Sequence, residues 1–307
     1  MNILIIGLGS IARKHIQALR EIGVSEMNIF ALRSGKHFSE EEEVINISDI
    51  REAGVAIDFA IISNPTFTHY QTLEWLADYS FPLFIEKPLF HTLDNNEVLM
   101  RKLLASRRKT YVACNLRFHP CILFLKNLLD TATTKINEVN TYCGSYLPDW
   151  RPGKDYRKVY SANENMGGGV HLDLIHELDY ITWLLGFPDQ IKSVCRKVSN
   201  LEIDSVDYAN YSLLYKDFTA NIILNYYRRD TKRNCEILFE DTTVTVDLIK
   251  QQVLRGEDLL FSSSISPLYT YIEQMKYFMS IMRTDQQVMN NIEEAYTVLK
   301  ICLQNNG

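Results

Sequence analysis

The chain has 307 residues, of which 46% are hydrophobic and 23% charged, a composition typical of a globular protein with well-filled cores. Its net charge of −6 disfavours nucleic-acid binding, because proteins that bind nucleic acids usually present a basic face. No apolar run approaches the roughly 20 residues that span a bilayer, so we expect no membrane-spanning segment.

Residues 1–118 alternate between short apolar runs and amphipathic stretches. The apolar runs predict strands over 3–6, 27–32, 57–62, 83–85 and 110–114, and the amphipathic stretches predict helices over 10–22, 66–79 and 94–107. The acidic run 40–43 is interpreted as a solvated face or loop. The first run has no basic start and no cleavage site, so we interpret it as a strand and not a signal peptide. Fully apolar strands separated by helices are typical of a doubly wound parallel sheet.

The pattern changes after about residue 118. A helix is predicted over 169–185, and runs rich in Tyr, Val, Ile and Thr predict antiparallel strands over 206–215, 219–226, 236–240 and 243–248. Two further helices are predicted over 269–282 and 290–304. We therefore expect an α/β protein, with a dinucleotide-binding Rossmann domain in residues 1–118 and an α+β domain on a mostly antiparallel sheet in residues 119–307.

The six cysteines are scattered and form no CxxC pair, which argues against a zinc ribbon and a disulfide framework. We accordingly expect no metal site. Reduced thiols are typical of the cytoplasm, where we expect the protein to act.

A glycine-rich turn joins the first predicted strand to the first helix. Gly7 permits a tight turn, Gly9 lets the backbone approach a pyrophosphate, and Ala12 keeps the helix close to the strand. Ser10 and Ile11 open the helix, whose free N–H groups favour an anion. The turn therefore predicts a dinucleotide site, with an ordinary glycine-rich turn and an S-adenosylmethionine site as the alternatives.

The residues after the second predicted strand indicate which dinucleotide binds. An NAD enzyme usually has Asp or Glu there to hold the ribose 2′-hydroxyl. This chain has Arg33 followed by Ser34, which suit a 2′-phosphate, so NADP is favoured over NAD. Alternatively, Arg33 stacks on adenine or faces water.

Five separated motifs, over nearly the whole chain, occur in an order that resembles the Gfo/Idh/MocA oxidoreductase family. They are Gly7–Ala12, Asn64-Pro65, Glu86-Lys87-Pro88, Arg117-Phe118, and Gly167-Gly168-Gly169 followed by Asp173 and His176. The resemblance implies a Rossmann domain followed by an α+β domain for substrate binding and oligomerisation. It also implies an NAD(P)-dependent dehydrogenase or reductase that acts on CH–OH groups of sugars, sugar acids, inositols or nucleotide sugars.

The resemblance assigns roles to residues near the nicotinamide. Asn64 and Pro65 would line the nicotinamide side of the cleft. Glu86 would contact the nicotinamide ribose, and Lys87 would reach the nicotinamide and the reacting oxygen. His69 is given a structural role, because a histidine near a helix start often caps the helix or packs.

Asp173 and His176 match the family's aspartate and catalytic histidine, although two residues separate them here and three in the commoner pattern. Proton transfer on the substrate oxygen favours a group with a pKa near working pH, and histidine is the usual choice. On one helix, Asp173, His176 and Asp179 would lie on adjacent faces, so a carboxylate could orient the imidazole. Lys87 would stabilise negative charge on the oxygen, and Asp173 would orient the histidine or bind substrate.

Two other interpretations of this segment stay open. The aspartates could cap or solubilise a surface helix, which would leave His176 incidental. Alternatively, His171, Asp173, His176 and Asp179 could hold a metal ion, because all four are ligand types.

Residues 150–160 are dense in aromatic and cationic side chains. Sugars bind to aromatic faces, and anionic groups bind to arginine forks. We therefore expect substrate contacts from this segment and from the Arg-Phe motif, namely from Trp150, Arg151, Tyr156, Arg157 and Arg117. A packed surface loop is the alternative.

The tyrosines at 208, 211, 215, 226 and 227 are interpreted as sheet residues. Because the exposed face of the large sheet commonly forms a subunit interface in the family, we expect a homodimer or homotetramer.

The function predicted is hydride transfer between a nicotinamide cofactor and a carbinol or carbonyl carbon of a sugar, sugar acid or nucleotide sugar. His176 would be the acid/base and Lys87 its electrostatic partner. A dinucleotide-binding sensor or scaffold without catalysis is the alternative from another class, and an imine or cyclic-diol reductase is the nearest enzymatic alternative. The expected partner is a small sugar-like molecule, with neither nucleic acid nor membrane.

Overall fold

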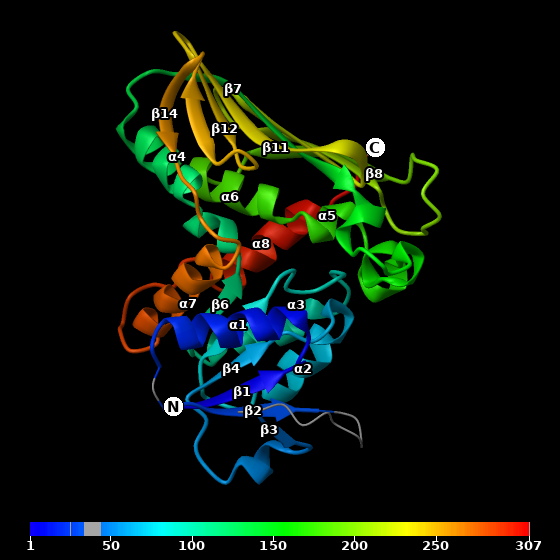
Figure 1. The fold of residues 1–307 in the computed structure, drawn as a ribbon, viewed down its shortest axis with the longest axis vertical. Coiled ribbons are helices and arrows are strands. Elements are labelled where there is room, and N and C mark those ends of the chain that lie inside the picture. The colour runs from blue at the N-terminus through cyan, green and yellow to red at the C-terminus, as the bar shows by residue number, and fades with distance from the viewer. Residues whose placement is uncertain (25, 34–43, 307) are drawn as a thin grey trace. The chain divides into compact units, whose positions relative to one another are not determined.

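The computed structural model describes residues 1–24, 26–33 and 44–306, and the chain forms two compact units (Figure 1). The first unit comprises Met1–Asn115 and Ser266–Thr297, and the second comprises Leu116–Ile265 and Val298–Gly307. The division expected from the sequence placed residues 266–297 in the second domain. In the structure these residues return to pack with the first unit.

A six-stranded parallel sheet forms the centre of the first unit, in the order β3-β2-β1-β4-β5-β6. The strands are β1 (Asn2–Ile6), β2 (Asn28–Leu32), β3 (Val44–Ile47), β4 (Phe59–Ile62), β5 (Leu83–Glu86) and β6 (Thr110–Ala113). The strand order reverses between β1 and β4, and ligands bind at such a reversal in doubly wound sheets. The predicted Rossmann architecture is confirmed.

Helices on the first unit are α1 (Ser10–Glu21), α2 (His69–Leu76), α3 (Asn96–Ala105) and α7 (Tyr269–Ile281), with short 3₁₀ turns η1 (Ile50–Ala53) and η2 (Thr66–Thr68). Helix α8 (Ile292–Leu303) contains the boundary between the two units. Helices α1 and α7 pack against each other. Phe278 of α7 stacks edge-on against Phe59 of β4 and Phe84 of β5, with ring centroids 5.3 Å apart in both pairs. This aromatic contact holds α7 on the sheet.

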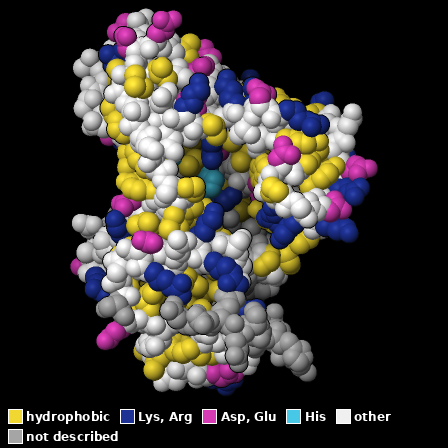
Figure 2. All heavy atoms as spheres, in the orientation of Figure 1, with side chains coloured by type: hydrophobic (Ala, Val, Ile, Leu, Met, Phe, Trp, Pro, Cys, Tyr) yellow, Lys and Arg dark blue, Asp and Glu magenta, His cyan; other side chains and the backbone are white. Residues whose placement is uncertain are grey.

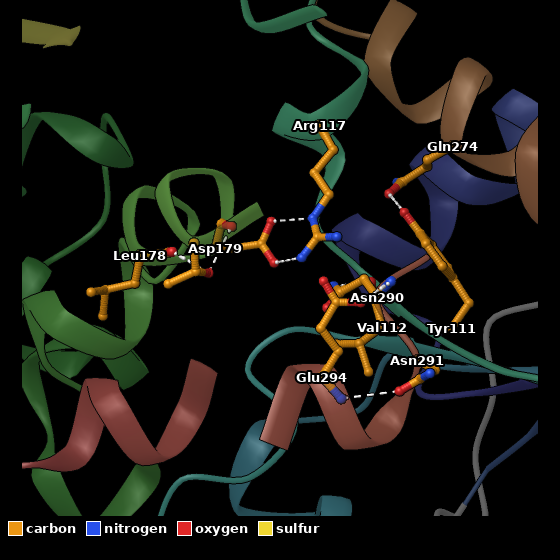
Figure 3. A network of polar contacts seen from close by, with 10 residues as sticks. Tyr111, Val112, Arg117, Leu178, Asp179, Gln274, Asn290, Asn291 and Glu294 are labelled. Atoms are coloured by element: carbon orange, nitrogen blue, oxygen red, sulfur yellow. Dashed lines mark hydrogen bonds and ion pairs between the residues drawn. The ribbon is translucent and has the colours of Figure 1, made fainter. Parts of the chain in front are cut away.

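The edge of β6 is covered by residues 286–292. The N–H of Val112 donates to the Asn290 carbonyl (2.9 Å), and the Asn290 side-chain amide donates to the Val112 carbonyl (2.8 Å) (Figure 3). Ile292 N–H donates to the Thr110 hydroxyl, and the Lys109 ammonium donates to the Gln286 carbonyl. The C-terminal return of the chain therefore closes an edge that would otherwise expose unpaired backbone groups.

The second unit is built on an eight-stranded sheet in the order β14-β13-β12-β11-β7-β10-β9-β8. All neighbours are antiparallel except β7 and β10, which are parallel. The strands are β7 (Ile136–Tyr146), β8 (Gln190–Arg196), β9 (Tyr208–Leu214), β10 (Thr219–Asn225), β11 (Tyr227–Phe239), β12 (Thr243–Asp247), β13 (Gln252–Arg255) and β14 (Asp258–Ser262). This arrangement confirms the predicted large, mostly antiparallel sheet.

Helices α4 (Pro120–Thr131), α5 (Val170–Asp173) and α6 (His176–Leu185) lie along this sheet (Figure 1). Helix α4 packs on β12, β13 and β14, and α5 packs on β9 and β10. Five 3₁₀ turns connect the elements: η3 (Asn115–Phe118), η4 (Leu147–Trp150), η5 (Tyr156–Lys158), η6 (Tyr160–Ala162) and η7 (Glu164–Met166). The single helix predicted over 169–185 is wrong, because the helical backbone is interrupted at residues 174 and 175.

Within the residues that the structure describes, no helix combines the length and apolar character that a bilayer crossing requires. Both acidic and basic side chains lie on the face shown in Figure 2.

Candidate active site

The turn after β1 is fixed by its contact with the turn after β4. Gly7 has φ of +91°, and a Cβ atom on it would lie 2.4 Å from backbone atoms of Asn64. The Ser63 hydroxyl donates to the Gly7 carbonyl at 2.9 Å. Only glycine combines this backbone conformation with so close an approach. The predicted tight-turn role of Gly7 therefore has a steric cause.

The N-terminus of α1 has the properties of an anion site. The N-cap is Gly9, with no side-chain hydrogen bond to the first turn among the described residues, and the first turn carries no acidic residue. A Cβ on Gly9 would meet no described atom within 4 Å, so the space beside it is open. Ser10 and Ile11 open the helix, and Ala12 is fully buried. These residues fit the pyrophosphate of a dinucleotide.

Arg33 lies immediately after β2. Its N–H donates to the Ile47 carbonyl at 2.9 Å, and its guanidinium lies 3.4 Å from the side-chain oxygen of Asn46 on β3. Ser34, the second residue predicted to select the cofactor, lies outside the described residues.

His69 joins the two loops that are predicted to surround the nicotinamide. Its ring nitrogens lie 3.1 Å from the carbonyl oxygens of Asn64 and Leu89, which belong to the loops after β4 and β5. Burial lowers the pKa of the His69 imidazole, and the two carbonyl contacts offset part of this effect. The Asn64 side chain donates to the Thr72 hydroxyl at 2.8 Å. These contacts agree with the structural role given to His69 and hold Asn64 and its neighbour Pro65 in place.

The end of β5 presents Glu86 and Lys87. The Glu86 carboxylate is buried and lies 2.5 Å from Nε2 of His15, a fully buried residue of α1. Lys87 is half-buried, whereas Glu86 and Pro88 on either side are buried, and the Lys87–Pro88 peptide bond is cis. Sequence reasoning missed His15. Its signal was a histidine within the apolar stripe of α1, between Ala12 and Ile16.

In the second unit, the glycine triplet lets a loop approach α5 closely. Gly167 and Gly169 have φ of +76° and +130°. A Cβ on Gly168 would lie 2.3 Å from the carbonyl oxygen of Tyr160 and 2.6 Å from that of Asn163. The triplet therefore brings residues 160–163 against the start of α5.

Asp173 and His176 lie on two helices and not on one. Asp173 ends α5, is 6% exposed, and accepts a hydrogen bond from the Tyr226 hydroxyl at 2.5 Å. His176 begins α6. Residues 170–182 are all buried except His176, which is half-buried. The prediction that Asp173, His176 and Asp179 share the adjacent faces of one helix is therefore wrong.

Asp179 instead holds Arg117. Nε and Nη2 of Arg117 donate to the two carboxylate oxygens at 2.9 and 2.8 Å, and each side chain is 1% exposed (Figure 3). The Arg117 guanidinium also lies 5.6 Å from the ring centre of Trp183. A buried guanidinium bound in this bidentate way has a structural role, so the expected substrate contact from Arg117 is not supported.

The predicted substrate loop is ordered by its own contacts. The Trp150 indole N–H donates to the Ser145 hydroxyl at 2.8 Å, and its ring packs edge-on against Tyr226. The Arg157 guanidinium binds the carboxylates of Asp155 and Glu202, both at 2.8 Å.

Two other side chains of this loop were expected to contact substrate. Arg151 is exposed, and its guanidinium lies 5.1 Å from the ring centre of Tyr160. The Tyr156 hydroxyl accepts a hydrogen bond from the N–H of Glu202 at 3.3 Å. Of the two loop arginines, Arg151 is the one not clamped between carboxylates in this structure.

No group of three or more His, Cys, Asp or Glu side chains in the described ranges is placed to hold a metal ion.

Two family models match the chain. Residues 1–113 match the oxidoreductase family with an NAD-binding Rossmann fold, and residues 126–245 match the GFO/IDH/MocA C-terminal domain. The chain belongs to the Gfo/Idh/MocA family. It is an oxidoreductase with an NAD-binding Rossmann fold, and the predicted fold and enzyme class are confirmed.

Similar proteins cover nearly the whole chain. The "Uncharacterized oxidoreductase YrbE" of Bacillus subtilis is 22% identical over 95% of this chain and 88% of its own length. The WlbA dehydrogenase of Bordetella pertussis, solved with NADH and UDP-GlcNAcA, has a TM-score of 0.78 at 14% identity, covering 98% of this chain and 94% of its own. A levoglucosan dehydrogenase solved with NADH has a TM-score of 0.83 at 15% identity, with 98% and 95% covered. The structural matches extend the shared fold over both units.

Proposed function

We propose that this protein transfers a hydride between a nicotinamide cofactor and a carbinol or carbonyl carbon of a sugar, sugar acid or nucleotide sugar. The bound nicotinamide would supply the hydride acceptor or donor. The chain would bind the substrate, orient it, and move the proton on its oxygen.

His176 is the acid/base in this proposal. The observation that carries the assignment is its exposure, because it is the one residue of 170–182 that is not buried. A proton-transfer group must reach the substrate and exchange its proton, which is easier for a half-buried side chain than for a fully buried one. Helix α6, anchored by Asp179 and by the ion pair between Glu177 and Arg233, would hold the imidazole in place.

Lys87 is the electrostatic partner. It is half-buried between two buried residues, in a loop tied to the turn after β4 through His69. An ammonium group in such a place would stabilise negative charge on the substrate oxygen more strongly than one in bulk water.

Substrate choice is supported by what the similar structures contain or are named for. WlbA was solved with UDP-GlcNAcA, and the other enzyme is named for levoglucosan. The exposed Arg151 and the aromatic side chains of its loop are suited to an anionic sugar. We expect Arg151→Ala to raise KM by several-fold. The matched Arg157→Ala should change KM little, because that guanidinium is held by two carboxylates.

The decisive experiment is single-turnover reduction or oxidation of NAD(H) and NADP(H) with UDP-GlcNAcA and levoglucosan as probes. We expect Lys87→Ala and His176→Ala each to slow the chemical step by roughly 100-fold or more, as positioned acid/base and electrostatic groups usually do. Lys102→Ala is the control, because that exposed lysine pairs with Asp78 on the surface. Parental rates in both variants would overturn the mechanism. Tight nucleotide binding without turnover by the parent would favour a sensor or scaffold.

Cofactor choice extends this proposal. The family is NAD-binding, and the chain has Arg33 in place of an acidic residue after β2, which favours use of NADP. Fluorescence titration should give a lower Kd for NADPH than for NADH. Arg33→Ala should weaken NADPH binding and leave NADH binding nearly unchanged. Equal effects on both nucleotides would place Arg33 on the adenine or in solvent.

Oligomerisation through the second unit is also proposed. A row of polar side chains crosses the open face of its sheet: Ser212 donates to Asn221 at 3.0 Å, and Asn221 donates to Asn140 at 3.2 Å. These residues are half-buried, and such an ordered row suits a contact with a second copy. Light scattering should show a dimer or tetramer, and a monomer at micromolar concentration would contradict it.

A further inference from the structure

Asp173 accepts a hydrogen bond from a tyrosine that lies far from it in the sequence of the second unit. The Tyr226 hydroxyl donates to the Asp173 carboxylate at 2.5 Å, although 53 positions separate the two residues. Tyr226 is 0% exposed and Asp173 is 6% exposed. A hydrogen bond from a neutral donor to a charged acceptor in a buried place is among the stronger ones.

The Tyr226 ring is itself fixed. Its backbone N–H donates to the Asp207 carbonyl at 3.0 Å, and its carbonyl accepts from the Leu147 N–H at 2.8 Å. The Trp150 ring packs edge-on against it, with ring centroids 5.2 Å apart. The Tyr226 hydroxyl therefore has a fixed place, and the hydrogen bond orients the Asp173 carboxylate relative to it.

Tyr226, at the bend between β10 and β11, differs in its acceptor from two other tyrosines of the second unit. Tyr211 and Tyr215 donate their hydroxyls to the backbone carbonyls of Cys302 and Gly186. Tyr226 donates instead to the aspartate of the sequence motif that ends at His176. A tyrosine that only satisfied its own buried hydroxyl would need no carboxylate.

A second phenol lies beside the same carboxylate. The pKa of Tyr160 is raised, chiefly by the negative charge of Asp173. The backbone of Tyr160 reaches this place because Gly168 has no Cβ.

We propose that Tyr226 is a positioning residue for the reaction, one that orients the Asp173 carboxylate toward the sugar-like substrate. This inference rests on the proposed function. The aspartate is then oriented by a residue at the bend between β10 and β11. It does not share one helix with His176, because the helical backbone is interrupted at residues 174 and 175.

Tyr226→Phe tests the inference, with Tyr211→Phe as the matched control. Both substitutions remove one hydroxyl from a fully buried tyrosine of the second unit. We expect Tyr226→Phe to lower kcat at least 10-fold, to change the pH profile of kcat/KM, and to leave the Kd for NADH unchanged. Tyr211→Phe should move neither kcat nor the pH profile.

Asp173→Asn completes a double-mutant cycle. If Tyr226 acts through Asp173, adding Tyr226→Phe to Asp173→Asn should lower kcat less than twofold further. Additive losses, or a Tyr226→Phe enzyme with the kcat and pH profile of Tyr211→Phe, would overturn the inference while the parent remains active. A parent that turns over neither UDP-GlcNAcA nor levoglucosan would count against the proposed function and this inference together.

Discussion

The imidazole of His15 on α1 lies 2.5 Å from the carboxylate of Glu86 at the end of β5, although 71 positions separate the two residues. Their side chains are 0% and 11% exposed. The contact ties helix α1 to the loop that carries Lys87. A histidine in the apolar stripe of α1 thus connects two parts of the proposed cofactor site.

His15→Phe should destabilise the protein and weaken nucleotide binding. The phenyl ring fills the space but cannot donate a hydrogen bond to Glu86. Among the described residues, Glu86 keeps the longer bond from the Lys87 N–H, at 3.3 Å. Loss of a buried hydrogen bond to a charged group costs about 2 kcal/mol. Urea unfolding and NADH titration measure both effects. Glu86→Gln, which keeps an acceptor for His15, should lose less; an unchanged urea midpoint for His15→Phe would contradict the prediction.

Gly7→Ala and Gly9→Ala should fail in different ways. A methyl group on Gly7 meets the Asn64 backbone at 2.4 Å, so we expect a misfolded or strongly destabilised protein. A methyl group on Gly9 meets no described atom, so we expect a parental Tm and a Kd for NADH raised at least 10-fold. Thermal melts followed by circular dichroism, together with fluorescence titration, separate the two outcomes. Normal NADH binding by Gly9→Ala would show that the dinucleotide does not approach this turn.

Arg117→Ala should act on stability and not on substrate affinity. Removing the guanidinium leaves the Asp179 carboxylate buried with an uncompensated charge, which costs about 3 to 5 kcal/mol. Arg117→Lys should recover only part of this loss, because lysine cannot make the bidentate contact. Urea unfolding gives the free energies. A stable Arg117→Ala enzyme with a raised KM would restore the substrate role that the sequence suggested.

Stability should fall between about pH 6.5 and pH 4. Burial lowers the pKa of His119 to about 4, and the positive charge of Arg233 adds to this; burial alone lowers the pKa of His171 to about 4. The unfolded histidines titrate near 6.5, so below that pH the unfolded chain binds protons that the folded chain does not, and the free energy of unfolding decreases.

His119→Asn isolates one of these groups. The His119 side chain caps α4 by accepting from the Cys121 N–H at 3.2 Å, and asparagine can cap in the same way without titrating. Urea unfolding from pH 7 to 4.5 should show a smaller fall in this variant than in the parent. Identical falls would mean that His119 is protonated equally in both states.

Most strands of the first unit were predictable because they are buried on both faces and read as continuous apolar runs. Strand β3 escaped because its residues are mostly half-buried or exposed, with only Ile47 buried. Strand β7 escaped for a related reason: its inward residues include Thr141 and Cys143 beside Val139, so its alternation is only weakly hydrophobic.

The need for glycine at position 7 was predictable, because only glycine fits so close to the Asn64 backbone. The role of Lys87 stays a prediction. The site was not predictable where a partner comes from a distant segment. Two such pairs are Arg117 with Asp179 and Asp173 with Tyr226. They form only once the second unit has folded, and no spacing in the sequence predicts them. The interruption of the helix between Asp173 and His176 was not predictable for a different reason. Leu174 and Ile175 are apolar residues of a kind common in buried helices, so the sequence shows no break there.

The closure of the β6 edge by residues 286–292 has a consequence for biosynthesis. When the first 115 residues have been synthesised, the helix that carries Phe278 begins about 150 residues further along the chain, and the segment that covers this edge begins about 170 residues further along. During this time the β6 edge of the nascent Rossmann sheet is unpaired, and Phe59 and Phe84 lack their contact with Phe278. Completion of the first unit is therefore among the last events of translation, and a fragment cut after residue 115 should aggregate.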